Sequence, residues 1–199
     1  MHSRGTARLT IDHERHDSKM TVDSRYSVRQ LANSDASRYR DLMLDAYENF
    51  SEAFTSTANE RRGKSLSWWE ERIASDDGTS VVFGAFDGDE LIGTAGIEYE
   101  TRDKTKHKSL LFGMFVRPAY RGHGIGRALI DAALGHARSR PGALVMLLSL
   151  TGGNAAAQRL YESCGFATFG VEPMGLCIDG AFRAKVHMWR TVATSATDR

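Results

Sequence analysis

The stretch from residue 110 to residue 150 constrains the fold of this chain most strongly. Residues 110–116 and 143–150 are almost continuously apolar, which predicts two buried strands. Between them, apolar residues recur at spacings of three and four over 126–139, which predicts an amphipathic helix that ends before Pro141. A strand, a helix and a strand joined this closely form a right-handed crossover between parallel neighbours. We therefore predict a sheet with a parallel central pair.

The rest of the chain predicts further elements of both kinds. Alternating or apolar runs predict strands at 26–31, 81–86, 91–100, 167–171 and 182–189. Helical spacing predicts helices at 36–50, 67–74 and 154–164, the first with Asp35 as its N-cap. Gly113 interrupts an apolar run and predicts a bulge. The fold class is α/β with a mixed sheet of about seven mostly antiparallel strands and four helices.

Composition and pattern also indicate the domain boundaries. Residues 1–24 are polar and aperiodic, and we expect a mobile extension there. A single domain is expected over 25–190, and the small polar residues 191–199 are expected to fray.

The charge balance excludes several function classes. Lysine and arginine total 26 against 25 acidic residues, so the net charge is +1, which argues against nucleic-acid binding. No apolar run approaches the roughly 20 residues that a membrane helix needs. The N-terminus lacks the apolar segment of a secretory signal, so we expect a cytoplasmic protein. Cys164 and Cys177 are expected to be free, mostly buried thiols, and no metal-ligating motif occurs, so no metal is expected.

A glycine-dense loop joins the strand at 110–116 to the following helix. Gly122, Gly124 and Gly126 alternate there, so several backbone N–H groups can point to one side at a helix N-terminus. This arrangement predicts a cradle for a pyrophosphate. The dinucleotide fingerprint is excluded because Arg127 stands where its third glycine would be, and the lysine of a Walker A loop is also absent.

Two motifs resemble one known family. Arg121-Gly-His-Gly-Ile-Gly126 is similar to the R/Q-x-x-G-x-G/A loop of the GNAT superfamily of N-acetyltransferases, and Val116-Arg-Pro118 resembles the end of the preceding strand in that family. Downstream, the segment from Asn154 to Phe166 resembles the family's N-x-x-A-x-x-L-Y-x-x-x-G-F signature. The resemblance covers roughly residues 26–190 and implies the GNAT-like fold, with a splayed parallel pair.

The resemblance also implies a set of acetyl-CoA contacts. Backbone groups of Phe115 and Val116 would pair with the pantetheine arm, and an amide near Met114 or Phe115 would bind the thioester carbonyl. The pyrophosphate would be held by the loop residues Arg121, Gly122, His123, Gly124, Ile125, Gly126 and Arg127. The side chain of His123 is itself expected to be exposed. Asn154 is either a cofactor contact or simply the N-cap of its helix.

Two residues are candidates for proton transfer. Tyr161 lies on the same helix face as Asn154 and is predicted to protonate the departing CoA thiolate. The alternative is a core aromatic residue whose hydroxyl is satisfied. The family often carries an acid six residues ahead of Val116, where this chain has Leu110. Antiparallel register would place Glu98 opposite Ser109 or Leu110, so Glu98 is a candidate general base. Alternatively Glu98 and Glu100 are solvated strand charges, and His107 or a water relay takes the proton.

The predicted function is transfer of an acetyl group from acetyl-CoA to a primary amine by direct attack in a ternary complex. The alternatives are a non-catalytic acyl-CoA-binding or regulatory domain and a transferase of a longer acyl group. The acceptor would be a small-molecule or peptide amine, and the protein a monomer or homodimer. The segment 47–71 mixes aromatic residues with five glutamates, which favours a small cationic amine, whereas Arg61 and Arg62 oppose it.

Overall fold

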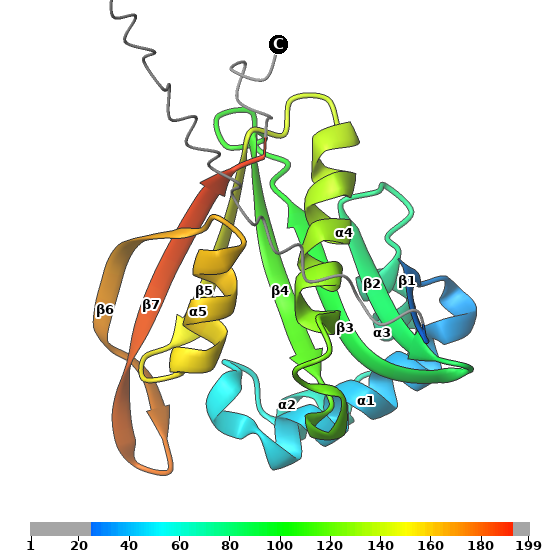
Figure 1. The fold of residues 1–199 in the computed structure, drawn as a ribbon, viewed down its shortest axis with the longest axis horizontal. Coiled ribbons are helices and arrows are strands. Elements are labelled where there is room, and N and C mark those ends of the chain that lie inside the picture. The colour runs from blue at the N-terminus through cyan, green and yellow to red at the C-terminus, as the bar shows by residue number, and fades with distance from the viewer. Residues whose placement is uncertain (1–24, 193–199) are drawn as a thin grey trace, which may run out of the picture.

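The computed structural model describes residues 25–192 (Figure 1). Seven strands form one sheet in the order β1-β2-β3-β4-β5-β7-β6. The strands are β1 (Tyr26–Gln30), β2 (Ser80–Asp87), β3 (Glu90–Tyr99), β4 (Lys108–Val116), β5 (Val145–Thr151), β6 (Ala167–Ile178) and β7 (Ala181–Thr191). All neighbours are antiparallel except β4 and β5, which confirms the predicted parallel central pair.

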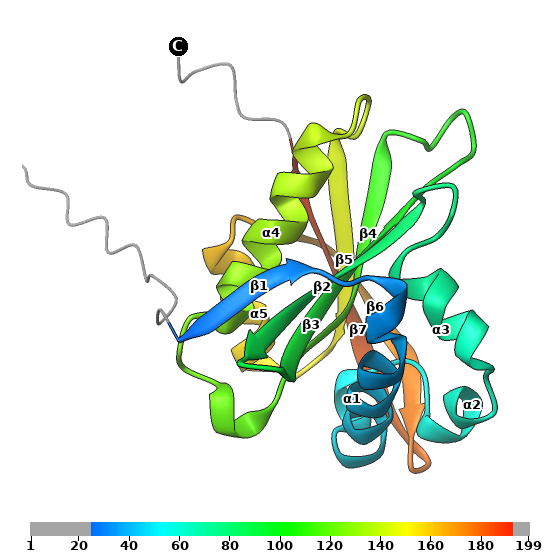
Figure 2. The same ribbon diagram turned by 90° about the vertical axis from the view of Figure 1, so that its right-hand side faces the viewer.

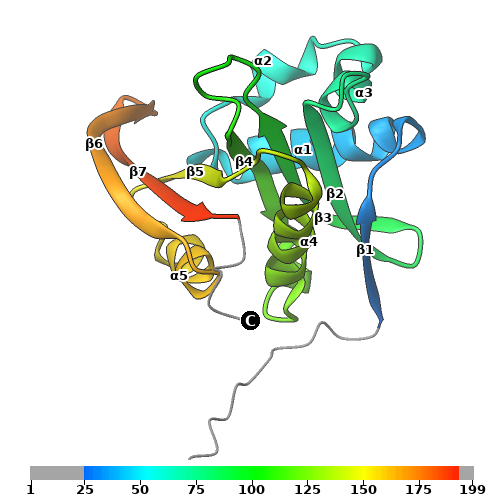
Figure 3. The same cartoon turned by 90° about the horizontal axis from the view of Figure 1, so that it is seen from above.

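Helices cover both faces of the sheet. They are α1 (Ala36–Asn49), α2 (Ala58–Arg62), α3 (Leu66–Ile73), α4 (Ile125–Ser139) and α5 (Ala155–Ser163). Figure 3 shows α1, α2 and α3 on one face and α4 and α5 on the other. The sequence predicted four helices and missed α2, whose five residues are too few for an apolar period. The first residue of α2 is nevertheless set by the local sequence, because Thr57 and Glu60 form a capping box.

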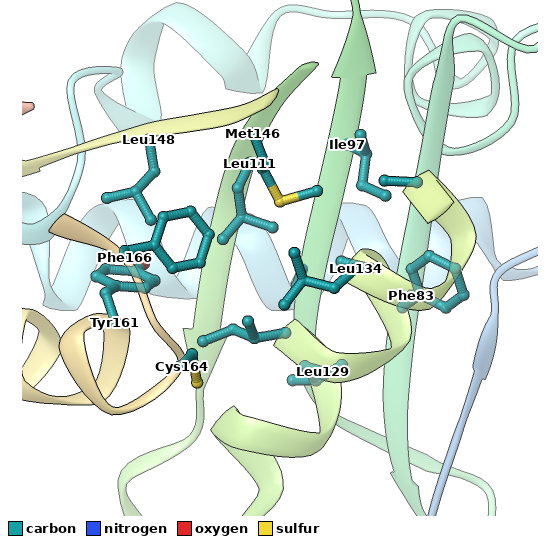
Figure 4. Packing of buried hydrophobic residues seen from close by; sticks show 14 of the residues in the cluster. Phe83, Ile97, Leu111, Leu129, Leu134, Met146, Leu148, Tyr161, Cys164 and Phe166 are labelled. Atoms are coloured by element: carbon teal, nitrogen blue, oxygen red, sulfur yellow. The ribbon is translucent and has the colours of Figure 1, made fainter. Parts of the chain in front are cut away.

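The core lies in two layers, one on each face of the sheet. Between the sheet and α4, the predicted inward residues Leu129, Ile130 and Leu134 are at most 1% exposed. Figure 4 shows this layer continuing past Leu111 and Met146 to the α5 side. The second layer packs α1 and α3 on the opposite face, and it contains most of the aromatic side chains of these helices.

Strands β4 and β5 separate along their length. They pair only from Lys108 to Leu110 on β4, and Figure 1 shows them diverging beyond that point. In the diverging part β4 carries the predicted bulge, because Gly113 has a φ of +59° and the register with β3 shifts there. The hydroxyl of Thr94 donates a hydrogen bond of 2.7 Å to the carbonyl of Gly113 and holds the bulge. The parallel pair is therefore splayed, as the resemblance implied.

Several boundaries differ from the sequence predictions. Strands β6 and β7 are longer than predicted, because their antiparallel pairing continues up to the hairpin turn that joins them. Thr191 ends β7 and Val192 is fully buried, so these two residues belong to the domain rather than to a frayed tail. The predicted tail 193–199 and extension 1–24 lie outside the described residues. Strand β5 is buried mainly on alternate residues, so it is not covered on both faces as predicted. No helix within 25–192 is long and apolar enough to span a membrane.

Asp35 precedes α1 but does not cap it with its side chain, contrary to the prediction. Its carboxylate instead accepts two hydrogen bonds from the guanidinium of Arg29, at 2.7 and 2.8 Å, and one from the N–H of Ala32. The side chain of Asp35 is only 4% exposed. The hydrogen bonds from Arg29 hold the pKa of this carboxyl below its ordinary value, although burial opposes them. The carboxylate therefore ties β1 to the start of α1.

Replacing Asp35 by asparagine is expected to lower the free energy of unfolding by about 1–2 kcal/mol at pH 7. A depressed pKa contributes stability above the ordinary carboxyl pKa, and that contribution is lost as the pH falls below about 4. Urea denaturation of both proteins at pH 7 and pH 3.5 measures the difference, which should shrink at the lower pH. Asp41→Asn, which alters the exposed pair of Asp41 with Arg40, is the control. An equal loss in the two variants would contradict the role of Asp35.

Candidate active site

A cavity of about 910 Å³ lies where the glycine loop, the end of β4 and α5 meet. The 3-10 turn η2 (Ser51–Ala53), which follows α1, closes another side. The strands β4 and β5 diverge, so their facing edges are not paired with each other in this region. The other elements can therefore meet at the opening between the two strands. The cavity therefore collects residues from four separate parts of the chain.

The glycine loop presents an unbroken row of backbone donors. Within residues 25–192, none of the six N–H groups of 122–127 donates to a protein acceptor. Gly122 and Gly124 adopt φ values of +84° and +77°, which L side chains rarely adopt, and Gly124 is the N-cap of α4. Gly122, Gly124 and Gly126 all line the cavity. Free N–H groups at a helix N-terminus suit an anion such as a pyrophosphate.

Strand β4 offers an open edge to the same cavity. Beyond Leu110 its β5-facing edge has no strand partner in the described part of the chain. Met114, Phe115 and Val116 line the cavity there. The ring of Phe115 packs against Phe50 at 5.4 Å between centroids, which fixes this end of the strand. An extended amide-bearing ligand can add to such an edge as an extra strand.

The charged side chains of the loop are anchored by backbone carbonyls. Arg121 Nε donates to the carbonyl of Val116 at 3.0 Å, and Arg127 Nη2 donates to the carbonyl of Ser163 at 2.8 Å. Both arginines line the cavity. His123 is exposed, with its ring edge-on to Tyr26 at 5.8 Å, and its side chain does not line the cavity, as expected from the sequence.

Helix α5 contributes Asn154 and Tyr161 to the cavity wall. Asn154 Oδ1 accepts a hydrogen bond of 3.1 Å from the N–H of Ala157, so its role as N-cap is confirmed. Tyr161 is 7% exposed, and its ring packs edge-on to Phe166 at 5.9 Å (Figure 4). Burial raises the pKa of Tyr161 well above its ordinary value. Its hydroxyl therefore stays protonated at neutral pH.

Two glutamates, Glu98 and Glu52, differ in their position relative to the cavity. Glu98 lies opposite Leu110, which confirms the predicted register, but it is exposed and is not among the residues that line the cavity. Glu52, on η2, is also exposed, but it does line the cavity. Sequence reasoning placed Glu52 only among the carboxylates of the acceptor region. Its position depends on the packing of η2 beside β4 and β5, for which the local sequence carries no signal.

The cysteines are free, but only one is buried. Cys164 is 4% exposed, and burial raises the pKa of its thiol, which disfavours the nucleophilic thiolate. Cys177 is exposed on β6, so the expectation that both thiols are buried was wrong for Cys177. Neither lines the cavity. Within 25–192, no three His, Cys, Asp or Glu side chains form a group that could hold a metal ion.

Curated proteins and solved structures resemble this chain over different lengths. The bS18-alanine N-acetyltransferase of Escherichia coli is 30% identical over 107 residues, which are 54% of this chain and 69% of that protein. The mycothiol acetyltransferase of Thermobispora bispora is 49% identical over 59 residues, 30% of this chain but only 20% of that protein. A putative acetyltransferase from Salmonella typhimurium, solved with acetyl-CoA, superposes with a TM-score of 0.68 at 22% identity, over 87% of this chain and 97% of that one.

The family assignment rests on the sequence profile together with this geometry. Residues 42–166, which carry both motifs, match the profile described as "Acetyltransferase (GNAT) family". The matched region includes the splayed strands, the glycine loop and α5. The chain therefore belongs to the GNAT family of acetyltransferases.

Proposed function

We propose that this protein transfers an acetyl group from acetyl-CoA to a primary amine by direct attack within a ternary complex. This proposal rests on the observation that one cavity is lined by the glycine loop with its free N–H groups, by the open edge of β4 and by Tyr161. These are the three features that a pyrophosphate, a pantetheine arm and a leaving thiolate require. Acetyl-CoA supplies the activated acyl group as a thioester.

The chain's own groups bind and orient the donor. The N–H groups of 122–127 hold the pyrophosphate, and the positive end of the α4 dipole strengthens that contact. The β4 edge at Phe115 and Val116 aligns the pantetheine arm toward the bulge at Gly113. A backbone N–H near Met114 or Phe115 donates to the carbonyl oxygen, where negative charge develops during attack.

Three proton transfers accompany the exchange of a C–S bond for a C–N bond. An amine is mostly protonated at neutral pH, so it must lose one proton before it attacks and another afterwards. We assign the acceptor of these protons to Glu52, acting directly or through water, because Glu52 lines the cavity and Glu98 does not. Glu52 passes the first proton to solvent before it accepts the second. The hydroxyl of Tyr161 gives its proton to the departing thiolate and is restored from solvent.

Glu52→Gln is expected to lower kcat/KM for the amine by about 100-fold, the lower end of the range for a general base, because water can partly replace it. Release of free CoA from acetyl-CoA and a panel of amines measures the rate. Glu98→Gln tests the competing carboxylate, and Glu48→Gln, which removes half of an exposed ion pair with Arg62, is the control. A loss confined to Glu98→Gln would contradict this assignment.

The same assay tests the overall proposal. Purified protein should release CoA in proportion to acetylated amine, identified by mass spectrometry. Binding of acetyl-CoA without turnover on any amine would favour a non-catalytic acyl-CoA-binding domain instead.

A further inference from the structure

The cavity of the candidate active site is lined from both faces of the sheet. The glycine loop begins α4, and α5 lies on the same face as α4, so the pyrophosphate cradle belongs to that face. Figure 2 shows α1, α2 and α3 on the other side of the sheet. The turn η2, which follows α1, brings Glu52 to the cavity from this second face. We call it the acceptor face, because the first face is taken by the proposed donor site.

One buried hydroxyl on the cavity wall has no partner in the protein. Within 25–192, the buried residues with an oxygen on a non-aromatic side chain are Asp35, Thr94, Ser109 and Thr151. The first three form hydrogen bonds through those oxygens, whereas the hydroxyl of Thr151 forms none. Thr151 is 7% exposed and lines the cavity, and its hydroxyl is not among the atoms that are sealed from solvent. This hydroxyl is therefore open to a ligand in the cavity.

Strand alternation places two cavity residues on the acceptor face. Leu148 and Leu150 of β5 belong to the core layer under α4, so Thr151, which follows Leu150, lies on the opposite face. Met188 of β7 belongs to the same core layer, so Arg183, five residues before it, also lies on the acceptor face. Arg183 lines the cavity, as Thr151 does.

The backbone holds Arg183 beside Thr151. The N–H of Gly152 donates a hydrogen bond of 2.7 Å to the carbonyl of Ala184, which ties the end of β5 to β7 next to Arg183. The side chain of Arg183 is exposed, and its guanidinium donates only to the carbonyl of Phe182, at 3.3 Å. A guanidinium has five N–H donors, so most of those on Arg183 are left for a ligand.

The acceptor face presents two opposite charges to the cavity, and neither is neutralised by the protein. Within residues 25–192, neither Glu52 nor Arg183 forms a salt bridge, with each other or with a third residue. The acid on the neighbouring strand β6, Glu172, contacts His187 Nε2 at 3.4 Å instead. A carboxylate and a guanidinium on one cavity wall without partners favour a ligand that carries both charges.

We propose that Arg183 and Thr151 bind the carboxylate of the acceptor while Glu52 faces its amine, so that the acetylated substrate is a small amino acid. This inference rests on the proposed acetyl transfer and on the role of Glu52 in it. The guanidinium of Arg183 supplies the counter-charge, and the hydroxyl of Thr151 donates a further hydrogen bond. An amine that lacks an acid leaves both groups without a partner, which makes Arg183 and Thr151 the specificity-determining residues.

The test assays the full-length protein, saturated with acetyl-CoA, on leucine, leucinamide and 3-methylbutylamine, and on methionine, methioninamide and 3-(methylthio)propylamine. Within each set the acid is replaced by a neutral amide and then by hydrogen, and kcat/KM is expressed per unprotonated amine. The amino acids should show a kcat/KM at least about tenfold higher than their neutral partners. Arg183→Gln should bring this ratio near one, Arg183→Lys should keep part of it, and Thr151→Val should lower it about threefold. Lys185→Gln is the matched control, since Lys185 is on the same strand and face but does not line the cavity.

Each variant should keep its kcat/KM for the neutral amines within about twofold, which shows that folding and catalysis are intact. Equal rates on the acidic and neutral compounds, a ratio that survives Arg183→Gln, or an equal loss in Lys185→Gln would each overturn the carboxylate site. A lower acetyl-CoA affinity of Arg183→Gln with an unchanged ratio would also overturn it, by assigning Arg183 to the cofactor. The proposed acetyl transfer fails separately, when no amine of either kind releases CoA. Calorimetric titration of the CoA-loaded protein with leucine and leucinamide then still decides whether the carboxylate is bound.

Discussion

Gly126→Val is expected to weaken acetyl-CoA binding on the order of 100-fold, about 2.7 kcal/mol, while the protein stays folded. Gly126 is the second residue of α4 and lines the cavity. A Cβ there would lie 2.9 Å from Leu160 Cδ2 and 3.3 Å from Met114 Cε, both on side chains that also line the cavity. The valine therefore occupies the space beside the free N–H groups and pushes its neighbours further into the site. Isothermal calorimetry with acetyl-CoA measures the loss.

Gly135→Val is the matched control for this variant. Gly135 lies in the same helix, is exposed, and a Cβ there meets nothing within 4 Å. Gly124 is a less informative position, because its φ of +77° would strain any side chain and mix loss of folding with loss of binding. Unchanged affinity in a folded Gly126→Val protein would remove the glycine loop from the binding site.

Tyr161→Phe is expected to lower kcat by about 10²–10⁴-fold with little change in acetyl-CoA affinity. The substitution removes only the hydroxyl, and the ring keeps its packing against Phe166. Burial raises the pKa of Tyr161 well above its ordinary value, so the hydroxyl carries its proton throughout the neutral range. The pH–rate profile of the variant should therefore keep its shape while the rate falls at every pH. Steady-state kinetics from pH 6 to pH 9 measures both quantities.

Tyr120→Phe controls for the loss of a hydroxyl at the same cavity. The Tyr120 hydroxyl donates to Glu90 Oε2 at 3.2 Å, at the exposed end of the site, so its removal should change kcat less than about threefold. Equal rates in the parent protein and Tyr161→Phe would assign Tyr161 to packing of the core alone. An equal fall in acetyl-CoA affinity and kcat would instead indicate a binding role.

Local signals determined most of the fold. The apolar runs and the helical spacing predicted all seven strands and four of the five helices, because a burial pattern is readable over a few residues. Gly113 predicted its own bulge for the same reason. The prediction for Asp35 was wrong because two interactions compete for the same side chain. Asp35 has the residue type of an N-cap, but Arg29 takes its carboxylate.

Some parts of the candidate site could likewise be predicted from the sequence, whereas others became visible only in the structure. The glycine loop could be found from the spacing of its glycines, and the open strand edge and Tyr161 from the resemblance to the GNAT family; all three line the cavity. The position of Glu52 could not. Glu52 stands on the short 3-10 turn η2, and only the tertiary packing of that turn brings it to the cavity. A residue's type shows what it can donate, whereas tertiary packing decides whether a partner is left for it.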